Sequence, residues 1–224
     1  MVKVNILNNT AIYTLEIEQA LQSVQSSRHG LSQATATHRL KQFGPNELSS
    51  KKTPLWKRIV EPFSSYFAVV ILLAALLSVY EKKWFEAVII SIILIVNAII
   101  FYLQQFSVAR ALNTLRAQDQ QNVDVIRDGH TTTIASTRLV PGDIVHMNEG
   151  MKVPADGRLI DVSHLQTDEA LLTGESLPIH KIASALPEKK EVYDQKNMLF
   201  KGTYVRAGSG LLLVTQTGNN KIGR

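Results

Sequence analysis

The sequence predicts an α+β membrane protein in which a transmembrane helical hairpin is inserted into a β-rich domain with short N-terminal helices. Three observations lead to this prediction. Two long uncharged apolar segments lie close together in the first half of the chain. The residues before them have a helical period, whereas the residues after them form short β-prone runs separated by glycine and proline turns.

The first apolar segment extends from Pro62 to Tyr80 and the second from Ala87 to Ala109. A helix needs about 20 apolar residues to cross the hydrocarbon core of a bilayer, so both segments are long enough to span it. In a soluble protein, helices that are apolar on every side need apolar partners all round. The remaining chain is too polar to provide them, and we therefore predict two transmembrane helices with the lipid bilayer as their partner.

Only the short polar loop 81–86 separates the two apolar segments, so we expect a tight antiparallel hairpin with both chain ends on one side. Basic residues are concentrated on that side: Lys51, Lys52, Lys57, Arg58, Arg110 and Arg116. Lysine and arginine accumulate in cytoplasmic loops. The prediction is a multi-pass integral membrane protein, of the plasma or bacterial inner membrane, with both termini cytoplasmic. A cleaved signal peptide is not expected, because the first 50 residues lack an early apolar core.

Two short helices are predicted before the hairpin. Ile17, Leu21 and Val24 recur with helical spacing and give the first helix a single apolar stripe. Ser32 is a suitable N-cap for the second helix, which Gly44-Pro45 should end.

The helix of the second apolar segment is expected to continue through Arg116. Beyond it, residues 123–126 and 131–134 predict a hairpin around the Asp128-Gly129 turn. Further turns are predicted at 141–143, at 156–157 and at 208–210, where Gly-Ser-Gly lacks the GxxxxGK[ST] pattern of a phosphate-binding loop.

Composition excludes several classes of site. The chain has no cysteine, which removes disulfides and thiolate metal sites. The histidines are scattered without the i, i+4 spacing of a helical metal site, so no metal site is predicted. The net charge of +5 is explained by its placement beside the first apolar segment rather than by a nucleic-acid partner, and none is predicted.

The most informative motif is Thr173-Gly174-Glu175-Ser176. Two other motifs precede it in a fixed order, Pro-Gly-Asp at 141–143 and Pro-Ala-Asp-Gly at 154–157. This series resembles the actuator domain of P-type cation-transporting ATPases. The segment from Gly-Leu-Ser at 30–32 to Phe-Gly-Pro-Asn-Glu-Leu at 43–48 is similar to the N-terminal segment of the calcium, sodium/potassium and proton pumps of that family.

The resemblance implies three regions. Residues 1–50 would be an N-terminal helical segment that packs on the actuator domain, 51–116 a transmembrane hairpin (about 62–80 and 87–109) with a cytoplasmic stalk, and 117–224 the β-rich actuator domain.

The resemblance also implies catalytic roles. In this family an aspartate of another domain is phosphorylated by ATP, and Glu175 would position a water against that phosphorus. Gly174 would let the backbone approach the phosphate, while the hydroxyls of Thr173 and Ser176 would brace the loop. The adjacent Asp168 and Glu169 should point to opposite faces of a strand, and they are interpreted as a solvated turn.

The sequence contains no Asp-Lys-Thr-Gly phosphorylation motif and no nucleotide-binding domain. We therefore predict no cofactor in this chain, with ATP and Mg²⁺ implied for a complete pump, and no enzymatic activity for the chain alone. The leading interpretation is the N-terminal part of a P-type pump of the calcium-like branch. Its partners would be the remaining pump domains and a transported cation, for which calcium is the first candidate. The alternatives are a membrane-anchored regulatory module that docks onto an intact pump and an unrelated membrane protein with a β-rich domain.

Overall fold

The computed structural model describes residues 9–47, 66–118, 121–174, 177–187 and 190–218. The chain folds into two compact units, Met1–Ser49 with Gln120–Arg224, and Ser50–Asp119. The first unit contains an antiparallel sheet and short helices, and the second contains two apolar helices. The prediction of a mixed helix-and-sheet protein is thereby confirmed.

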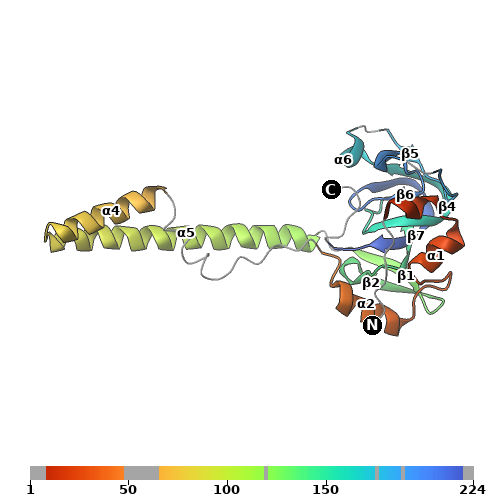
Figure 1. The fold of residues 1–224 in the computed structure, drawn as a ribbon, viewed down its shortest axis with the longest axis horizontal. Helices are drawn as coiled ribbons and strands as arrows, with labels where there is room; N and C mark the ends of the chain where they lie inside the picture. Colours follow the sequence, from red (N-terminus) through yellow and green to blue (C-terminus); the bar gives the residue numbers. More distant parts are fainter. Residues whose placement is uncertain (1–8, 48–65, 119–120, 175–176, 188–189, 219–224) are drawn as a thin grey trace. The chain divides into compact units, whose positions relative to one another are not determined.

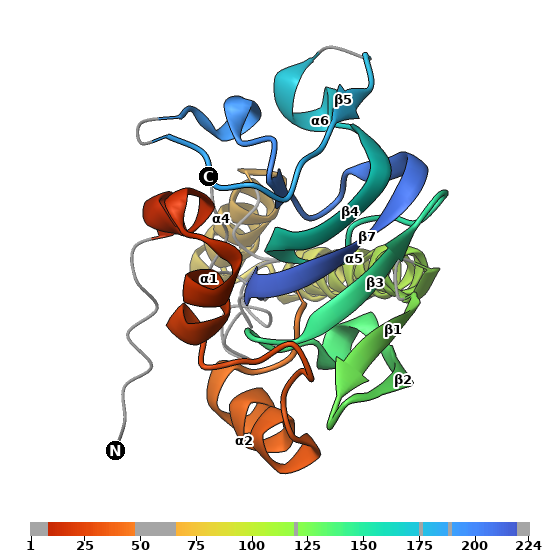
Figure 2. The same ribbon diagram turned by 90° about the vertical axis from the view of Figure 1, so that its right-hand side faces the viewer.

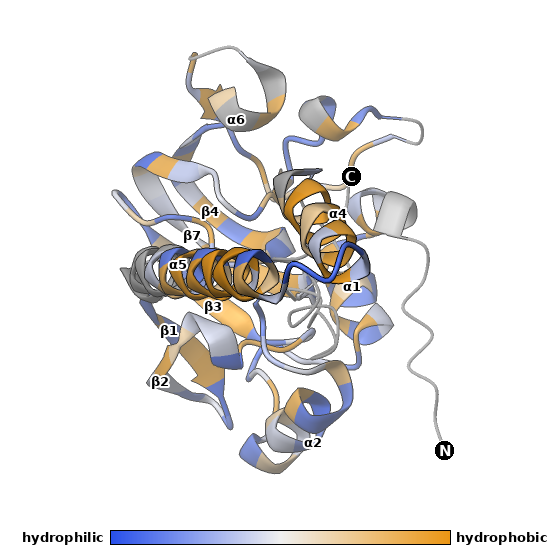
Figure 3. Ribbon diagram, turned by 90° about the vertical axis from the view of Figure 1, so that its left-hand side faces the viewer, coloured by the Kyte–Doolittle hydropathy of each residue, from blue (hydrophilic) through white to orange (hydrophobic). Residues whose placement is uncertain are grey.

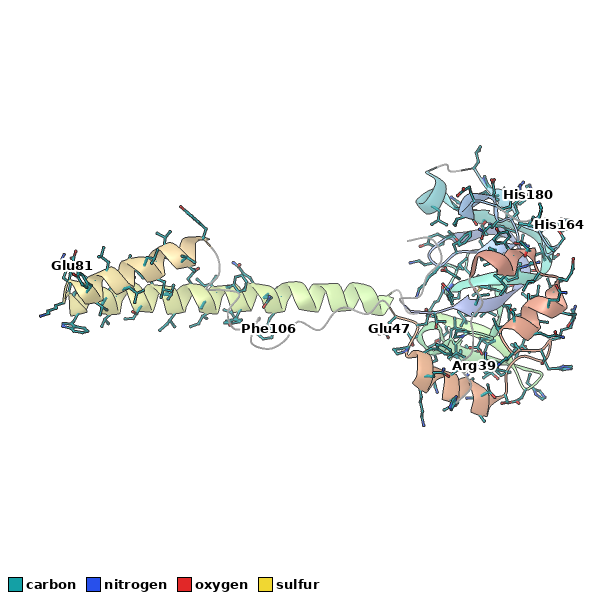
Figure 4. All side chains as sticks on the ribbon, in the orientation of Figure 1. Arg39, Glu47, Glu81, Phe106, His164 and His180 are labelled. Atoms are coloured by element: carbon teal, nitrogen blue, oxygen red, sulfur yellow. The ribbon has the colours of Figure 1, made fainter. Side chains whose placement is uncertain are left out.

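The described residues of the helical unit form α4 (Tyr66–Tyr80) and α5 (Trp84–Gln118), which lie against each other (Figure 1). Both are strongly hydrophobic along their apolar stretches, as Figure 3 shows. The chain turns between them at Lys82, whose φ is 61°. In Figure 4, Glu81 marks this turn and Phe106 lies far along α5. Helix α5 extends beyond Arg116 to Gln118, which confirms the predicted continuation of the second apolar helix.

Within the described residues, one helix is long and apolar enough to cross a membrane, at Trp84–Ser107. The apolar stretch Ala68–Tyr80 of α4 is shorter. The prediction of the second span is thus confirmed in length and composition. The predicted first span is not confirmed, because its residues 62–65 lie outside the described part of the chain. The orientation in a membrane stays a prediction.

The N-terminal part of the β-rich unit folds as η1 (Asn9–Thr14), α1 (Ile17–Ser23) and α2 (Gln33–Phe43). Leu21 and Val24 of the predicted apolar stripe are buried. The Ser32 hydroxyl accepts a hydrogen bond from the Thr35 N–H at 3.2 Å, and α2 ends before Gly44, whose φ is +76°. Both predicted helices and their end signals are confirmed.

In the described part of the chain, seven strands form one antiparallel sheet. They are β1 (Asn122–Arg127), β2 (His130–Ala135), β3 (Ile144–Asn148), β4 (Asp156–Asp168), β5 (Ile179–His180), β6 (Met198–Leu199) and β7 (Tyr204–Gln216). Their order is β2-β1-β3-β7-β4-β5, with β6 also paired to β4, and Figure 2 shows this succession. The short helical turns η3 (Ser136–Arg138) and η4 (Val192–Asp194) and the helix α6 (Ala170–Thr173) connect them.

Both faces of the sheet are covered by apolar side chains. Neighbouring residues of a strand alternate between the faces. Val145 and Leu212 therefore contribute to one core cluster, whereas Ile144 and Leu213 contribute to another. Leu21 of α1 joins the second cluster, so the N-terminal residues complete the core on that face.

Two glycine-containing segments that the sequence predicts as turns lie inside strands instead. Gly157 belongs to β4, and Gly208 with Gly210 belongs to β7. A Cβ atom on Gly157 would lie 2.4 Å from the Leu213 carbonyl oxygen, and one on Gly208 would lie 2.4 Å from the Ser163 carbonyl oxygen. The turn predictions were wrong because these glycines permit the close approach of two long strands.

One buried amide connects distant parts of the β-rich unit. Asn46 is 4% exposed, and its Nδ2 donates to the carbonyl oxygens of Ser136 (3.1 Å) and Pro154 (2.9 Å). Its Oδ1 accepts hydrogen bonds from Lys201 Nζ (2.9 Å) and from the Gly218 N–H (3.1 Å). The residue thus joins the end of the described N-terminal part to the last described residue of the domain.

Candidate functional site

The structure places the start of the Thr173-Gly174-Glu175-Ser176 motif at the end of α6. Thr173 is the last residue of this helix, and Gly174 follows it as the C-cap. Glu175 and Ser176 lie outside the described residues. The catalytic roles of the four motif residues therefore stay predictions, and the described geometry concerns the framework on either side of them.

Gly174 has a structural reason for being glycine. Its φ is +77°, in the left-handed region, and its N–H donates to the Ala170 carbonyl oxygen at 2.9 Å. No atom lies within 4 Å of the position that a Cβ would occupy, so the requirement comes from the backbone conformation rather than from crowding. The left-handed cap ends α6 abruptly at the motif.

Asp168 holds the start of α6 from the end of β4. Its Oδ1 accepts a hydrogen bond from the Ala170 N–H at 3.1 Å, and its Oδ2 pairs with Arg206 Nη2 of β7 at 2.5 Å. The Ala170 N–H and, next, the Arg206 guanidinium lower the pKa of the Asp168 carboxyl. Because this pKa lies below its ordinary value, the stabilisation is present at neutral pH and is lost as the pH falls through the lowered pKa.

Arg206→Gln tests the two contributions to this carboxyl. We expect the pKa of Asp168 to rise when the guanidinium is removed, yet to stay below its ordinary value because the Ala170 N–H remains. The measurement is a pH titration of the Asp168 carboxyl by NMR in the wild-type and variant chains. A pKa unchanged by the substitution would show that Arg206 has no electrostatic influence on Asp168.

Glu169 and Lys181 form a buried ion pair between Lys181 Nζ and Glu169 Oε1. Both side chains are 0% exposed, and Thr167 Oγ1 donates to the same Glu169 oxygen at 3.0 Å. Burial lowers the pKa of Lys181, and the Glu169 carboxylate opposes this effect. The interpretation of Glu169 as part of a solvated turn was therefore wrong, although Asp168 and Glu169 do point to different surroundings.

This ion pair was not predicted, although the sequence pattern indicates the burial of one partner, Glu169. Leu165, Thr167 and Glu169 share the two-residue period of β4, and all three are buried. Continuing the period through Thr167 would have placed Glu169 on the inward face. Lys181 gave no comparable signal, because β5 is too short to define a face by itself.

The motif segment returns to the sheet beside the strand that it left. In β5, Ile179 pairs with Thr167 and His180 pairs with Gln166. Figure 4 labels His180 at this return point. Leu177, on the way into β5, is 74% exposed, so the outer part of the segment presents an apolar side chain to the surroundings.

The described residues do not form a metal site. Among them, no group of three or more His, Cys, Asp or Glu side chains is arranged to hold a metal ion.

Comparisons with known proteins match both parts of the chain in which these motifs lie. Residues 117–222 match the P-type ATPase actuator domain, and residues 12–78 match the N-terminus of cation transporter ATPases. A β-rich domain with this match and this motif is an actuator domain.

Three relatives show the relationship over longer stretches. The chain is 37% identical to calcium-transporting ATPase 1 of Bacillus cereus over 220 residues, which cover 95% of this chain and 25% of that protein. It is 36% identical to a calcium-transporting ATPase of Listeria monocytogenes over 209 residues, which cover 93% of this chain and 24% of that protein. It is 40% identical to the probable cation-transporting ATPase F of Mycobacterium tuberculosis over 191 residues, which cover 85% of this chain and 21% of that protein.

The chain belongs to the P-type cation-transporting ATPases and corresponds to their N-terminal part. It spans about a quarter of the length of these relatives.

Proposed function

We propose that this chain supplies the actuator function of an ATP-driven cation pump, in which Glu175 promotes hydrolysis of an aspartyl phosphate carried by another domain. The observation that carries the proposal is the position of the motif. Thr173-Gly174-Glu175-Ser176 begins at the end of the short helix α6, which comes shortly after a strand that is paired on both sides, β4, in a domain that matches the actuator family.

The chemistry of the motif suits this reaction. A carboxylate can accept a proton from a water molecule and orient that water so that the lone pair of the water oxygen points at phosphorus. The aspartate carboxylate is the leaving group. Water supplies the oxygen of the new P–O bond, the acyl-phosphate bond breaks, and inorganic phosphate is released. Gly174 and the hydroxyls of Thr173 and Ser176 would orient Glu175 for this step.

The remaining functions of a pump need residues beyond this chain. ATP would bind to, and phosphorylate, domains whose motifs this sequence lacks. We therefore propose that the chain alone neither hydrolyses ATP nor transports an ion. Calcium is the proposed cargo, since two of the similar proteins are calcium-transporting ATPases.

We also propose that α4 and α5 form a membrane hairpin with both chain ends cytoplasmic. Support comes from the contact between the two helices, from the span-length apolar stretch Trp84–Ser107 and from the basic residues that flank the apolar segments. This topology would place the actuator domain on the side where ATP is available.

Glu175→Gln in a complete pump tests the proposed catalytic role. Glutamine keeps the shape of the side chain but cannot accept the proton of the attacking water, so phosphoenzyme decay should be about 100-fold slower. The pump is labelled with radioactive ATP, chased with unlabelled ATP, and the first-order decay of the phosphoenzyme is followed. Formation of the phosphoenzyme should persist, and decay at the wild-type rate would refute the role of Glu175.

A further inference from the structure

The two ends of the motif segment are fastened at one place in the sheet. Residues 170–180 leave the sheet after β4 and return as β5, which pairs with β4 through Thr167 and Ile179. Glu169 precedes this segment and Lys181 follows it. Their buried ion pair therefore closes the base of the segment that contains Glu175.

The surroundings of the pair make its geometry specific. Glu169 Oε1 receives both the Lys181 ammonium and the Thr167 hydroxyl, and Lys181 Nζ lies 5.7 Å from the centroid of the Phe200 ring. The Lys181 N–H donates to the Leu165 carbonyl oxygen at 2.9 Å. The lysine is thus held at both its backbone and its side chain.

Such a pair contributes more to register than to stability. Removing two charges from water costs several kcal/mol per ion, and their attraction offsets this only when the geometry is good. A slip of β5 by one residue on β4 would turn Lys181 to the opposite face of the sheet and leave Glu169 without its cation. The wrong register therefore has a much higher free energy than the right one. The difference would be smaller if two apolar side chains occupied these positions.

We propose that Glu169 and Lys181 are positioning residues for the dephosphorylation step, because their ion pair sets the register at which β5 returns and so the place where Glu175 is presented. The inference rests on the proposed function of Glu175. Neither residue would contact the phosphate or the water, and each acts only through the backbone of the motif segment.

The test uses the complete pump and the rate constant of phosphoenzyme decay. Glu169→Ala and Lys181→Met should each slow decay by about 10- to 100-fold, since small displacements of a catalytic group have effects of this size. Glu169→Gln should slow decay less than Glu169→Ala, because its amide oxygen still accepts from Thr167 and Lys181 although the charge is lost. A purely structural role would lower the amount of phosphoenzyme but not the rate constant of the molecules that form it.

Glu18→Ala is the control, because it removes the ion pair with Arg28, whose side chains are both exposed and belong to the N-terminal part of the chain, and it should leave the decay rate unchanged. Glu175→Gln is measured in parallel. Slow decay in Glu175→Gln with wild-type decay in Glu169→Ala and Lys181→Met overturns the positioning role and leaves the proposed function standing. Wild-type decay in Glu175→Gln overturns the proposed function itself.

Hydrogen exchange provides a second measurement that does not need an active pump. In the chain purified in detergent, Glu169→Ala should accelerate exchange of the Lys181 amide, whose hydrogen bond to Leu165 depends on the register of β5. The Val145 amide in the central strand β3 should keep its wild-type protection. Unchanged protection of the Lys181 amide would overturn the proposal, whatever the expression level of the pump variants.

Discussion

Asp143→Ala is expected to lower the free energy of unfolding of the β-rich unit by about 3–5 kcal/mol, the range for removing one partner of a buried ion pair. Asp143 is fully buried and accepts hydrogen bonds from Arg127 Nε at 2.9 Å and Arg127 Nη2 at 2.8 Å. Its Oδ2 also accepts from the Val140 N–H at 2.9 Å. The substitution would leave a guanidinium and a backbone N–H buried without their acceptor.

The measurement is urea unfolding of the full chain in detergent, with the folded fraction of the β-rich unit followed by pulse proteolysis. Glu18→Ala is the control, because the Arg28–Glu18 pair is equally short at 2.7 Å but has both side chains exposed. That change should alter stability by less than about 1 kcal/mol. Equal effects of the two substitutions would show that burial of the Arg127–Asp143 pair has no energetic importance.

Gly30→Ala is expected to lower the free energy of unfolding by about 2–5 kcal/mol, the second largest effect. A positive φ and steric overlap both contribute to this loss. Gly30 has a φ of +77°, and a Cβ there would lie 1.9 Å from the Ile126 carbonyl oxygen. The overlap is with backbone, so no side-chain rotation can relieve it. Leu31, the next residue, bridges to Arg127 of β1, and the N-terminal segment should detach from the sheet first.

Gly44→Ala separates the two causes. Gly44 has nearly the same φ, +76°, but no atom lies within 4 Å of its Cβ position. Its substitution should therefore lower the free energy of unfolding only through the backbone conformation, by about 1–3 kcal/mol, because φ 76° with ψ 178° is a region that essentially only glycine adopts. Both variants are compared by urea unfolding and by protease cleavage within residues 9–30. If Gly30→Ala lowers the free energy of unfolding no more than Gly44→Ala does, the backbone around Gly30 can move away from Ile126 with little loss of stability.

The parts of the fold that the sequence predicted are those with local causes. Ser32 caps α2 within its own first turn, and Gly44-Pro45 ends that helix. Asp128-Gly129 builds the β1–β2 hairpin because both residues adopt a positive φ. Gly157 and Gly208 were misinterpreted because the same residue type also serves close strand approach. Which role applies depends on a partner strand distant in sequence.

In the candidate site, too, some features could be predicted from the sequence and others depend on strand pairing. The order of the motifs sufficed to predict the family, because such a series can be recognised without any knowledge of packing. The role of Glu175 stays a prediction. The Glu169–Lys181 pair could not be predicted in full, because the burial of Lys181 follows from the pairing of β5 with β4. A lysine next to a two-residue strand has no periodic pattern that would identify its face.

The buried amide of Asn46 can transmit force, because the chain continues from residue 47 towards the helical unit. Tension applied at residue 47 would reach the Ser136 and Pro154 carbonyl groups and the Gly218 N–H through the same side chain. Asn46 therefore links the N-terminal part of this unit to its last described residue, Gly218. Tension near residue 47 should therefore load these hydrogen bonds together rather than one after another.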